Sequence, residues 1–255
     1  MTASFLGRGL RLAIGTLTAI RVPVVHRVSP ADARSAMTLA PLAAVPLGVV
    51  VGLVCWAGAR LELPAVSVAF VALALLGIGS RALHLDGLSD VADGLTSSYD
   101  PERSLAVMKS GTAGPAGAAA LVLVLGIQAG GLMWLAVPGD LHAALIAGLA
   151  VCVSRAALWI TCCTLIPPAR KDGLGLAFTQ SVPVPATVLG WVVLAGLAAF
   201  VDPVRGPLTV AAAAAVVVML VIHTVRRFGG VTGDVFGAGI ELALAVLLIG
   251  AAGTV

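Results

Sequence analysis

Three aspartates and a histidine lie close together in the stretch HLDGLSDVADGL, residues 84–95, in a chain of which only 11% of the residues are charged. Asp86, Asp90 and Asp93 follow the spacing i, i+4, i+7, which on an α-helix places three carboxylates on one face. Like charges this close repel one another unless a cation neutralises them. Oxygen ligands beside an anionic substrate are the usual setting for Mg²⁺, so we predict that these aspartates are catalytic and hold Mg²⁺. The alternative is an ordinary solvated acidic segment.

His84 precedes the three aspartates. A histidine at this place is either a catalytic base or a hydrogen-bonding neighbour of Asp86, and its position in the sequence does not decide between them.

A second candidate cluster is RRFGGVTGDVFGAGIEL, residues 226–242. Arg226 and Arg227 can donate to a phosphate, and Asp234 stands where an apolar segment begins, so we predict it as a fourth catalytic and metal-binding carboxylate. Glu241 lies two helical turns deeper on the same face, and Arg155 lies within another apolar segment. Ionisable residues inside a membrane span are functional candidates by default. Arg155 is therefore predicted either to bind substrate or to pair with Glu241 or an aspartate.

The composition indicates what must position these residues. Sixty per cent of the chain is apolar and its mean hydropathy is +1.09, which is typical of membrane proteins. A spanning helix needs roughly 20 apolar residues, and seven segments of about this length are present: 37–59, 64–83, 115–138, 141–166, 185–201, 207–225 and 235–254. We predict an all-α polytopic bundle of about seven transmembrane helices, a single domain over residues 1–255. The N-terminal stretch is predicted to be an interfacial amphipathic helix.

The basic residues predict the orientation, since cytoplasmic segments are enriched in Lys and Arg. With a cytoplasmic N-terminus, the outer loops hold only Arg60 and Arg205. The inner segments hold eleven basic residues: Arg8, Arg11, Arg21, Arg27, Arg34, Arg103, Lys109, Arg170, Lys171, Arg226 and Arg227. We therefore predict a multi-pass inner-membrane protein with segments 84–114, 167–184 and 226–234 in the cytoplasm and the C-terminus outside.

Carboxylates holding Mg²⁺ and arginines binding phosphate are the parts expected of an enzyme that transfers a phosphorus-containing group. Since the polar segments share one predicted face, the active site is expected at the cytoplasmic surface. No nucleic-acid partner is predicted.

The order of motifs resembles the cobalamin synthase family, the adenosylcobinamide-GDP ribazoletransferases. The resemblance covers nearly the whole chain and rests on HLDGLSDVADGL, ERSLAVMKSGTAGPAG, the SR pair at residues 154–155, and RRFGGVTGDVFGAGIEL. It implies that adenosylcobinamide-GDP is joined to α-ribazole or its 5′-phosphate, with Mg²⁺, to give adenosylcobalamin or its 5′-phosphate and GMP. Membrane lipid is the expected surrounding, and a homo-oligomer or association with other enzymes of cobalamin biosynthesis is left open.

By the same resemblance, Thr232 and Gly233 would complete the site beside Asp234, and Lys109 is a candidate substrate contact. One departure stands next to Lys109. Many family members read Met-Lys-Asp-Ser-Arg-Ile-Gly where this chain reads MKSGTAG, so Ser110 and Thr112 replace an acid and a base. We leave both out of the predicted site.

Two other classes remain open. A CDP-alcohol phosphatidyltransferase also places aspartates at the cytoplasmic end of a span, but its D-G-x-x-A-R pattern is not matched by DGLSDVADG. An ion-coupled transporter would account for Arg155 and Glu241, yet transporters generally bind near the bilayer midplane between repeated halves, and no internal repeat is seen in the sequence.

Overall fold

The computed structural model describes residues 2–253, and side chains for all of these except residues 2–5 and 174. In this part of the chain the secondary structure is helical, without strands, as predicted. The elements are α1 (Thr2–Leu17), α2 (Pro30–Thr38), α3 (Ala40–Ala43), α4 (Val45–Arg60), α5 (Ala65–Gly79), α6 (Leu83–Ser97), α7 (Pro101–Lys109), α8 (Pro115–Ala136), α9 (Leu141–Ser154), α10 (Ala157–Thr161), the 3₁₀ turn η1 (Leu174–Ala177), α11 (Val184–Ala198), α12 (Arg205–Phe228) and α13 (Gly233–Ala251).

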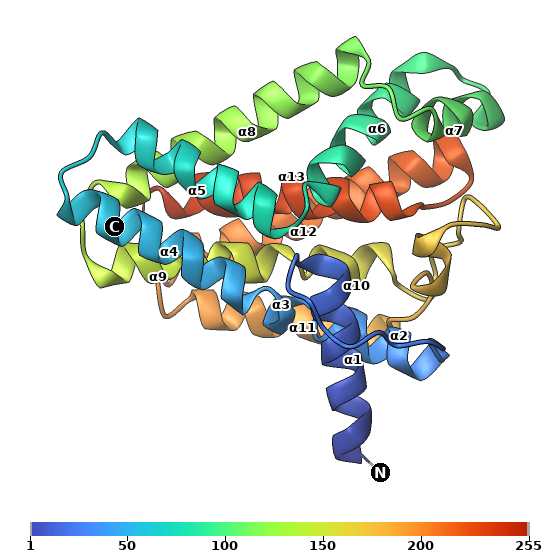
Figure 1. The fold of residues 1–255 in the computed structure, drawn as a ribbon, viewed down its shortest axis with the longest axis horizontal. Helices are drawn as coiled ribbons and strands as arrows, with labels where there is room; N and C mark the ends of the chain where they lie inside the picture. The colour runs from blue at the N-terminus through green and yellow to red at the C-terminus, as the bar shows by residue number, and fades with distance from the viewer. Residues whose placement is uncertain (1, 254–255) are drawn as a thin grey trace.

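The long helices run side by side as a bundle around α13 (Figure 1), which is buried along most of its length. Helix α13 contacts α6, α8, α9 and α12. The loops at one end of the bundle are short, whereas α6, α7 and the segment around η1 gather at the other end (Figure 1). The predicted collection of polar segments at one end is therefore confirmed. Which side of the membrane that end faces stays a prediction.

All seven predicted apolar segments contain helices, but their lengths differ. Among the described residues, α8, Leu141–Thr161, α12 and α13 are long and apolar enough to cross a membrane. Helices α5 and α6 pass the same test only together, with a 92° bend between them. Helices α4 and α11 have 16 and 15 residues. At about 1.5 Å per residue they rise roughly 24 and 22 Å, less than the roughly 30 Å of the hydrocarbon core. Length and composition thus support four full spans, or five with the bent pair.

Prolines explain why the predicted span 37–59 is interrupted. Helix α2 ends at Thr38, and α3 and α4 each begin with a proline in the first turn, Pro41 and Pro46. Proline has no N–H to donate and clashes with the preceding turn, so it starts helices better than it continues them.

The predicted span 64–83 ends early because the backbone turns at Arg81 and Ala82. Both residues have positive φ angles, 57° and 54°, a strained conformation for non-glycine residues. The Arg81 guanidinium Nη2 donates to the carbonyls of Gly15 and Thr16, at 3.0 and 3.1 Å, near the end of α1. Helix α1 is thereby attached to the bend that precedes α6.

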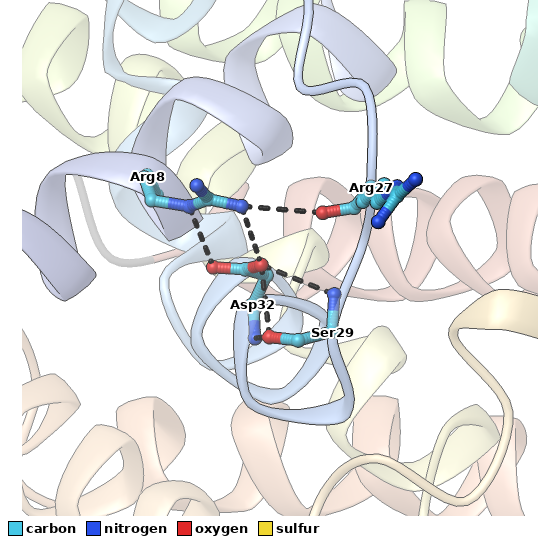
Figure 2. A network of polar contacts seen from close by, with 4 residues as sticks. All are labelled: Arg8, Arg27, Ser29 and Asp32. Atoms are coloured by element: carbon cyan, nitrogen blue, oxygen red, sulfur yellow. Dashed lines mark hydrogen bonds and ion pairs between the residues drawn. The ribbon is translucent and has the colours of Figure 1, made fainter.

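Helix α1 runs across the direction of the long helices, and its N-terminus projects away from the bundle (Figure 1). A second attachment joins it to α2 (Figure 2): Arg8 Nε and Nη2 donate to the two carboxylate oxygens of Asp32 at 3.1 and 3.0 Å. Asp32 also forms a capping box with Ser29 at the start of α2. Arg8, and then the Ser29 backbone N–H, lower the pKa of Asp32 to about 2.

Candidate active site

Two glycines bring α6 and α13 into close contact. A Cβ at Gly87 would lie 2.6 Å from the carbonyl oxygen of Asp234, and a Cβ at Gly237 would lie 2.9 Å from the Cα of His84. No side chain fits at either position, so the two backbones touch in antiparallel directions. The contact places the first two turns of α6, which carry Asp86 and Asp90, beside the first turn of α13.

Three of the predicted metal ligands gather at this contact. Asp86 is exposed, while Asp90 and Asp234 are half-buried. The charge of Asp90 is repelled by Asp86, Asp234 and Asp93, and Asp234 is repelled by Asp86. Burial and mutual repulsion both disfavour so many negative charges here, which makes the cluster a suitable place for a cation.

A polar pocket of about 230 Å³ opens next to Asp234. Its walls are held together by an isolated parallel bridge between Pro168 and Val231. On the other side, a Cβ at Gly175 would lie 2.6 Å from the backbone nitrogen of Gly233, so η1 packs directly against the start of α13. Thr232 Oγ1 donates to Asp234 Oδ2 at 3.1 Å. The predicted residues Thr232, Gly233 and Asp234 therefore form one wall of this pocket.

The opposite wall contains residues that the sequence interpretation did not include. Arg170 Nη1 lies 3.8 Å from Asp234 Oδ2, and its Nη2 donates to the Leu105 carbonyl at 2.6 Å. Asp172 lines the same pocket and pairs with Lys109 at 2.7 Å; this contact lowers the pKa of Asp172. The sequence could have indicated Arg170 and Asp172, because the stretch ARKDG concentrates charged residues in an otherwise apolar chain.

Asp93 occupies a different place from the other aspartates. Its two carboxylate oxygens accept the backbone N–H groups of Gly114, the N-cap residue of α8, at 2.7 Å, and of Gly117, in the first turn of α8, at 2.9 Å. The glycines permit this approach, because a Cβ at either one would lie within 2.5 Å of an Asp93 carboxylate oxygen. The carboxylate thus caps the N-terminus of α8, a role that the helical spacing alone could not reveal.

The two arginines at the end of α12 also differ from each other. Arg227 donates to the carbonyls of Leu95 and Ser98 at the end of α6 and stacks over the Tyr99 ring, 4.5 Å from its centroid. These contacts hold the end of α6. Arg226 is exposed, with no hydrogen-bond or ion-pair partner among the described residues, and so is the freer of the two to meet a ligand.

Arg155, Glu241 and His84 form a separate cluster inside the bundle. Arg155 is fully buried at the break between α9 and α10, where its Nη1 donates to Val151 O and Ser154 Oγ. His84 Nδ1 lies 3.8 Å from Glu241 Oε1, and Glu241 is the acid whose charge acts on Arg155. Neither residue lines the pocket. The charge of Glu241 acts on Arg155 inside the bundle, but among the contacts of the described residues these two side chains form no ion pair or hydrogen bond. The predicted pairing and the predicted substrate contact of Arg155 therefore both stay predictions.

Gln128 completes the interior cluster and was missed from the sequence. It is fully buried, and its Nε2 donates to both the side chain and the backbone carbonyl of Glu241, at 2.8 and 3.1 Å. An amide inside an apolar helix is itself a signal, because polar side chains in membrane helices often hydrogen-bond between helices.

Comparison with known proteins gives the family. Residues 9–252 match the model of the family described as cobalamin-5-phosphate synthase. A Nocardioides protein named adenosylcobinamide-GDP ribazoletransferase is 52% identical over 94% of this chain and 96% of its own. Proteins with the same name from Frankia casuarinae and Syntrophobacter fumaroxidans are 31% and 34% identical, each over 94% of this chain and over 92% and 96% of their own. The chain belongs to the cobalamin-5-phosphate synthase family. No solved structure matches it.

At MKSGTAG, where this chain departs from many family members, Ser110 and Thr112 contact each other. The hydroxyls of Ser110 and Thr112 lie 2.9 Å apart, and Ser110 Oγ reaches the Val107 carbonyl at 2.8 Å. Both residues are exposed. A neutral hydroxyl pair therefore links the two positions without any charge, outside the pocket.

The family resemblance implies Mg²⁺. The predicted carboxylates fit this ion only as an open site that shares it with water and substrate phosphates. Among the described residues, no three His, Cys, Asp or Glu side chains form a group that could hold a metal ion by themselves. Mg²⁺ usually retains several waters and takes one or two carboxylates together with substrate phosphates. Asp86, Asp90 and Asp234 would be the carboxylates for such an open site, and each oxygen of Asp93 already accepts a backbone N–H at the start of α8. The four predicted metal ligands stay predictions.

Proposed function

We propose that this protein is an adenosylcobinamide-GDP ribazoletransferase of the inner membrane, with its site facing the cytoplasm. It would join adenosylcobinamide-GDP to α-ribazole or its 5′-phosphate and release GMP. The observation that carries the proposal is the 52% identity, over 94% of this chain, to the Nocardioides protein of that name. The carboxylates at the α6–α13 contact and the adjoining polar pocket are suitable parts for this reaction.

In the diphosphate of adenosylcobinamide-GDP, one oxygen bridges the two phosphorus atoms. The reaction breaks the bond between this oxygen and the phosphorus on the cobinamide side. A ribose hydroxyl of the acceptor attacks that phosphorus, its proton is lost, and GMP leaves. Because the phosphorylated acceptor keeps its 5′-phosphate in the product, the attacking hydroxyl is not the 5′ one. Arg170 stands at the pocket wall, 3.8 Å from Asp234, where its charge would orient the diphosphate.

Mg²⁺, held by Asp86, Asp90 and Asp234, would supply neutralisation of the diphosphate charge. Asp86 is the exposed carboxylate of the cluster, so we propose that it meets the ion on the solvent side, where the hydroxyl proton would leave to water. His84 is only 5% exposed and turns Nδ1 toward Glu241, so its proposed role is to orient the interior end of α6.

Purified protein in lipid nanodiscs, mixed with adenosylcobinamide-GDP, α-ribazole and Mg²⁺, should release GMP and stop doing so in EDTA. Replacing α-ribazole by its 5′-phosphate compares the two acceptors. The proposal fails if no GMP appears with either acceptor. Release of CMP from a CDP-alcohol would instead favour the phosphatidyltransferase alternative.

A further inference from the structure

The N-terminal part of the chain carries an unusual excess of positive charge. Residues 2–61 contain six arginines and a single acid, Asp32. Asp32 is buried and already paired with Arg8 (Figure 2). The remaining arginines of this region therefore have no acidic partner within it.

Three of these arginines are free and exposed. Among the described residues, the side chains of Arg11, Arg21 and Arg27 have no hydrogen-bond or ion-pair partner. Only the backbone carbonyl of Arg27 meets Arg8, at 3.2 Å, and its side chain points away from the Asp32 carboxylate (Figure 2).

Arg11 also lines a pocket of about 230 Å³ between the second half of α1 and residues 22–25. Gly15 and Thr16 also line this pocket, and Val22 and Val24 contribute to its apolar side. A guanidinium beside an apolar wall suits a ligand that combines a phosphate with hydrocarbon.

Large apolar side chains are exposed on the same segment. Leu6 is 55% exposed, Ile20 43%, Val24 75% and Val28 37%. Helix α1 runs across the long helices (Figure 1), as a helix lying in the plane of a membrane surface would. Arginines alternating with exposed apolar residues are typical of interfacial segments that bind anionic lipids.

We infer that α1 and residues 18–28 form a binding surface for an anionic phospholipid, with Arg11 in the pocket binding the lipid phosphate. Arg21 and Arg27 add attraction to the headgroup layer, and Ile20 and Val24 contact the acyl chains. The exposed apolar side chains favour a lipid over free phosphate, which would leave them in water.

The test uses the full chain in detergent, titrated with phosphatidylglycerol or phosphatidylcholine, with retained lipids counted by native mass spectrometry. Phosphatidylglycerol should be preferred. An arginine near an anionic surface contributes about 1 kcal/mol, so Arg11→Gln and Arg21→Gln should each weaken retention about fivefold. Arg11→Lys, which keeps the charge, should retain most of the binding.

Arg103→Gln is the matched control, because Arg103 is exposed on α7 and its loss changes the net charge equally. It should leave lipid retention unchanged. Equal effects of Arg103→Gln and Arg11→Gln, or no preference between the two lipids, would overturn the inference. Displacement of the lipid by inorganic phosphate would show that the pocket takes the anion alone. None of these results depends on enzymatic activity.

Discussion

At the scale of single residues, one regular spacing serves two purposes. Asp86 and Asp90 face the Asp234 end of α13, whereas Asp93, one turn further, caps α8. The spacing predicted the helix and its acidic face correctly. It could not predict the division of roles, because the partners of Asp93 lie more than 20 residues away in the chain.

Neutralising each aspartate should separate these roles. Asp86→Asn and Asp90→Asn should reduce GMP release by orders of magnitude at an unchanged melting temperature, with partial rescue at high Mg²⁺. Asp93→Asn should instead lower the melting temperature, because an amide replaces one of two acceptors and leaves a buried N–H unpaired, at about 1–3 kcal/mol. Thermal melts and GMP assays on the same preparations decide this.

Asp100→Asn is the control for that series. Asp100 accepts the Glu102 N–H at the start of α7, and Asn caps helices about as well as Asp. Near wild-type activity and stability are expected. If all four variants behave alike, the distinction between metal ligands and capping residue is wrong.

The interior charges should depend on each other. Arg155→Leu removes the cation whose charge acts on Glu241, and Glu241→Leu removes the acid whose charge acts on Arg155, so each should lower the melting temperature. Removing both charges should restore much of the loss. Melting temperatures of the two single variants and the double variant in one detergent measure the coupling. Additive losses would show that the charges do not interact.

At the scale of elements, the site depends on how α6 packs against α13. Hydropathy located both segments, because apolar runs are visible in the sequence. It placed the end of α5 too late, since the positive φ angles of Arg81 and Ala82 leave no trace in hydropathy. The pocket beside Asp234 was equally invisible, because a bridge between Pro168 and Val231 joins segments far apart in the chain.

A methyl group should be enough to disturb this packing. In Gly87→Ala the new Cβ meets the Asp234 carbonyl at 2.6 Å, whereas at Gly126 in α8 nothing lies within 4 Å. Alanine otherwise favours a helix over glycine by about 1 kcal/mol. Gly87→Ala should therefore lower both GMP release and the melting temperature, while Gly126→Ala should preserve or raise the latter. If the two variants showed the same GMP release and melting temperature, α6 and α13 would tolerate a wider separation.

The attachment of α1 to α2 should weaken in acid. The pKa of Asp32 is lowered from 3.8 to about 2 in the folded protein, so its contribution is complete above about pH 4 and lost as the pH falls toward 2. Pepsin cleavage between residues 18 and 28 should accelerate over this interval. In Asp32→Asn, cleavage should be fast already at pH 4. If the rate of pepsin cleavage of the wild-type protein did not rise as the pH falls from 4 to 2, the Arg8–Asp32 ion pair would not be what attaches α1 to α2.

At the scale of the whole molecule, α6, α7 and the segment around η1 gather at one end of the bundle and the short loops at the other (Figure 1). The pocket, which η1 and the start of α13 line, belongs to the first of these ends. Charge asymmetry and hydropathy were sufficient to predict this division. They were not sufficient to count the crossings, because α4 and α11 are apolar but short.

Reporter fusions should settle the crossings. A reporter inserted at Gly111, in the exposed turn between α7 and α8, should be cytoplasmic, and one fused after α13 should be external. The part of the chain after Gly111 would then cross an odd number of times. Two cytoplasmic reporters would show an even number of crossings after Gly111, with the short helix α11 entering and leaving on the same side.

The packing of α6 on α13 also has a consequence during synthesis. The ribosome must add every residue between Ser97 and Gly233 before the partner of α6 exists, which takes roughly ten seconds at typical elongation rates. During that interval Gly87 has no backbone to meet, and Arg155, once made, waits for Glu241. A nascent chain stalled before α13 therefore holds a cation within the membrane without the nearby acid, and at the end of the bundle a carboxylate cluster that still lacks Asp234.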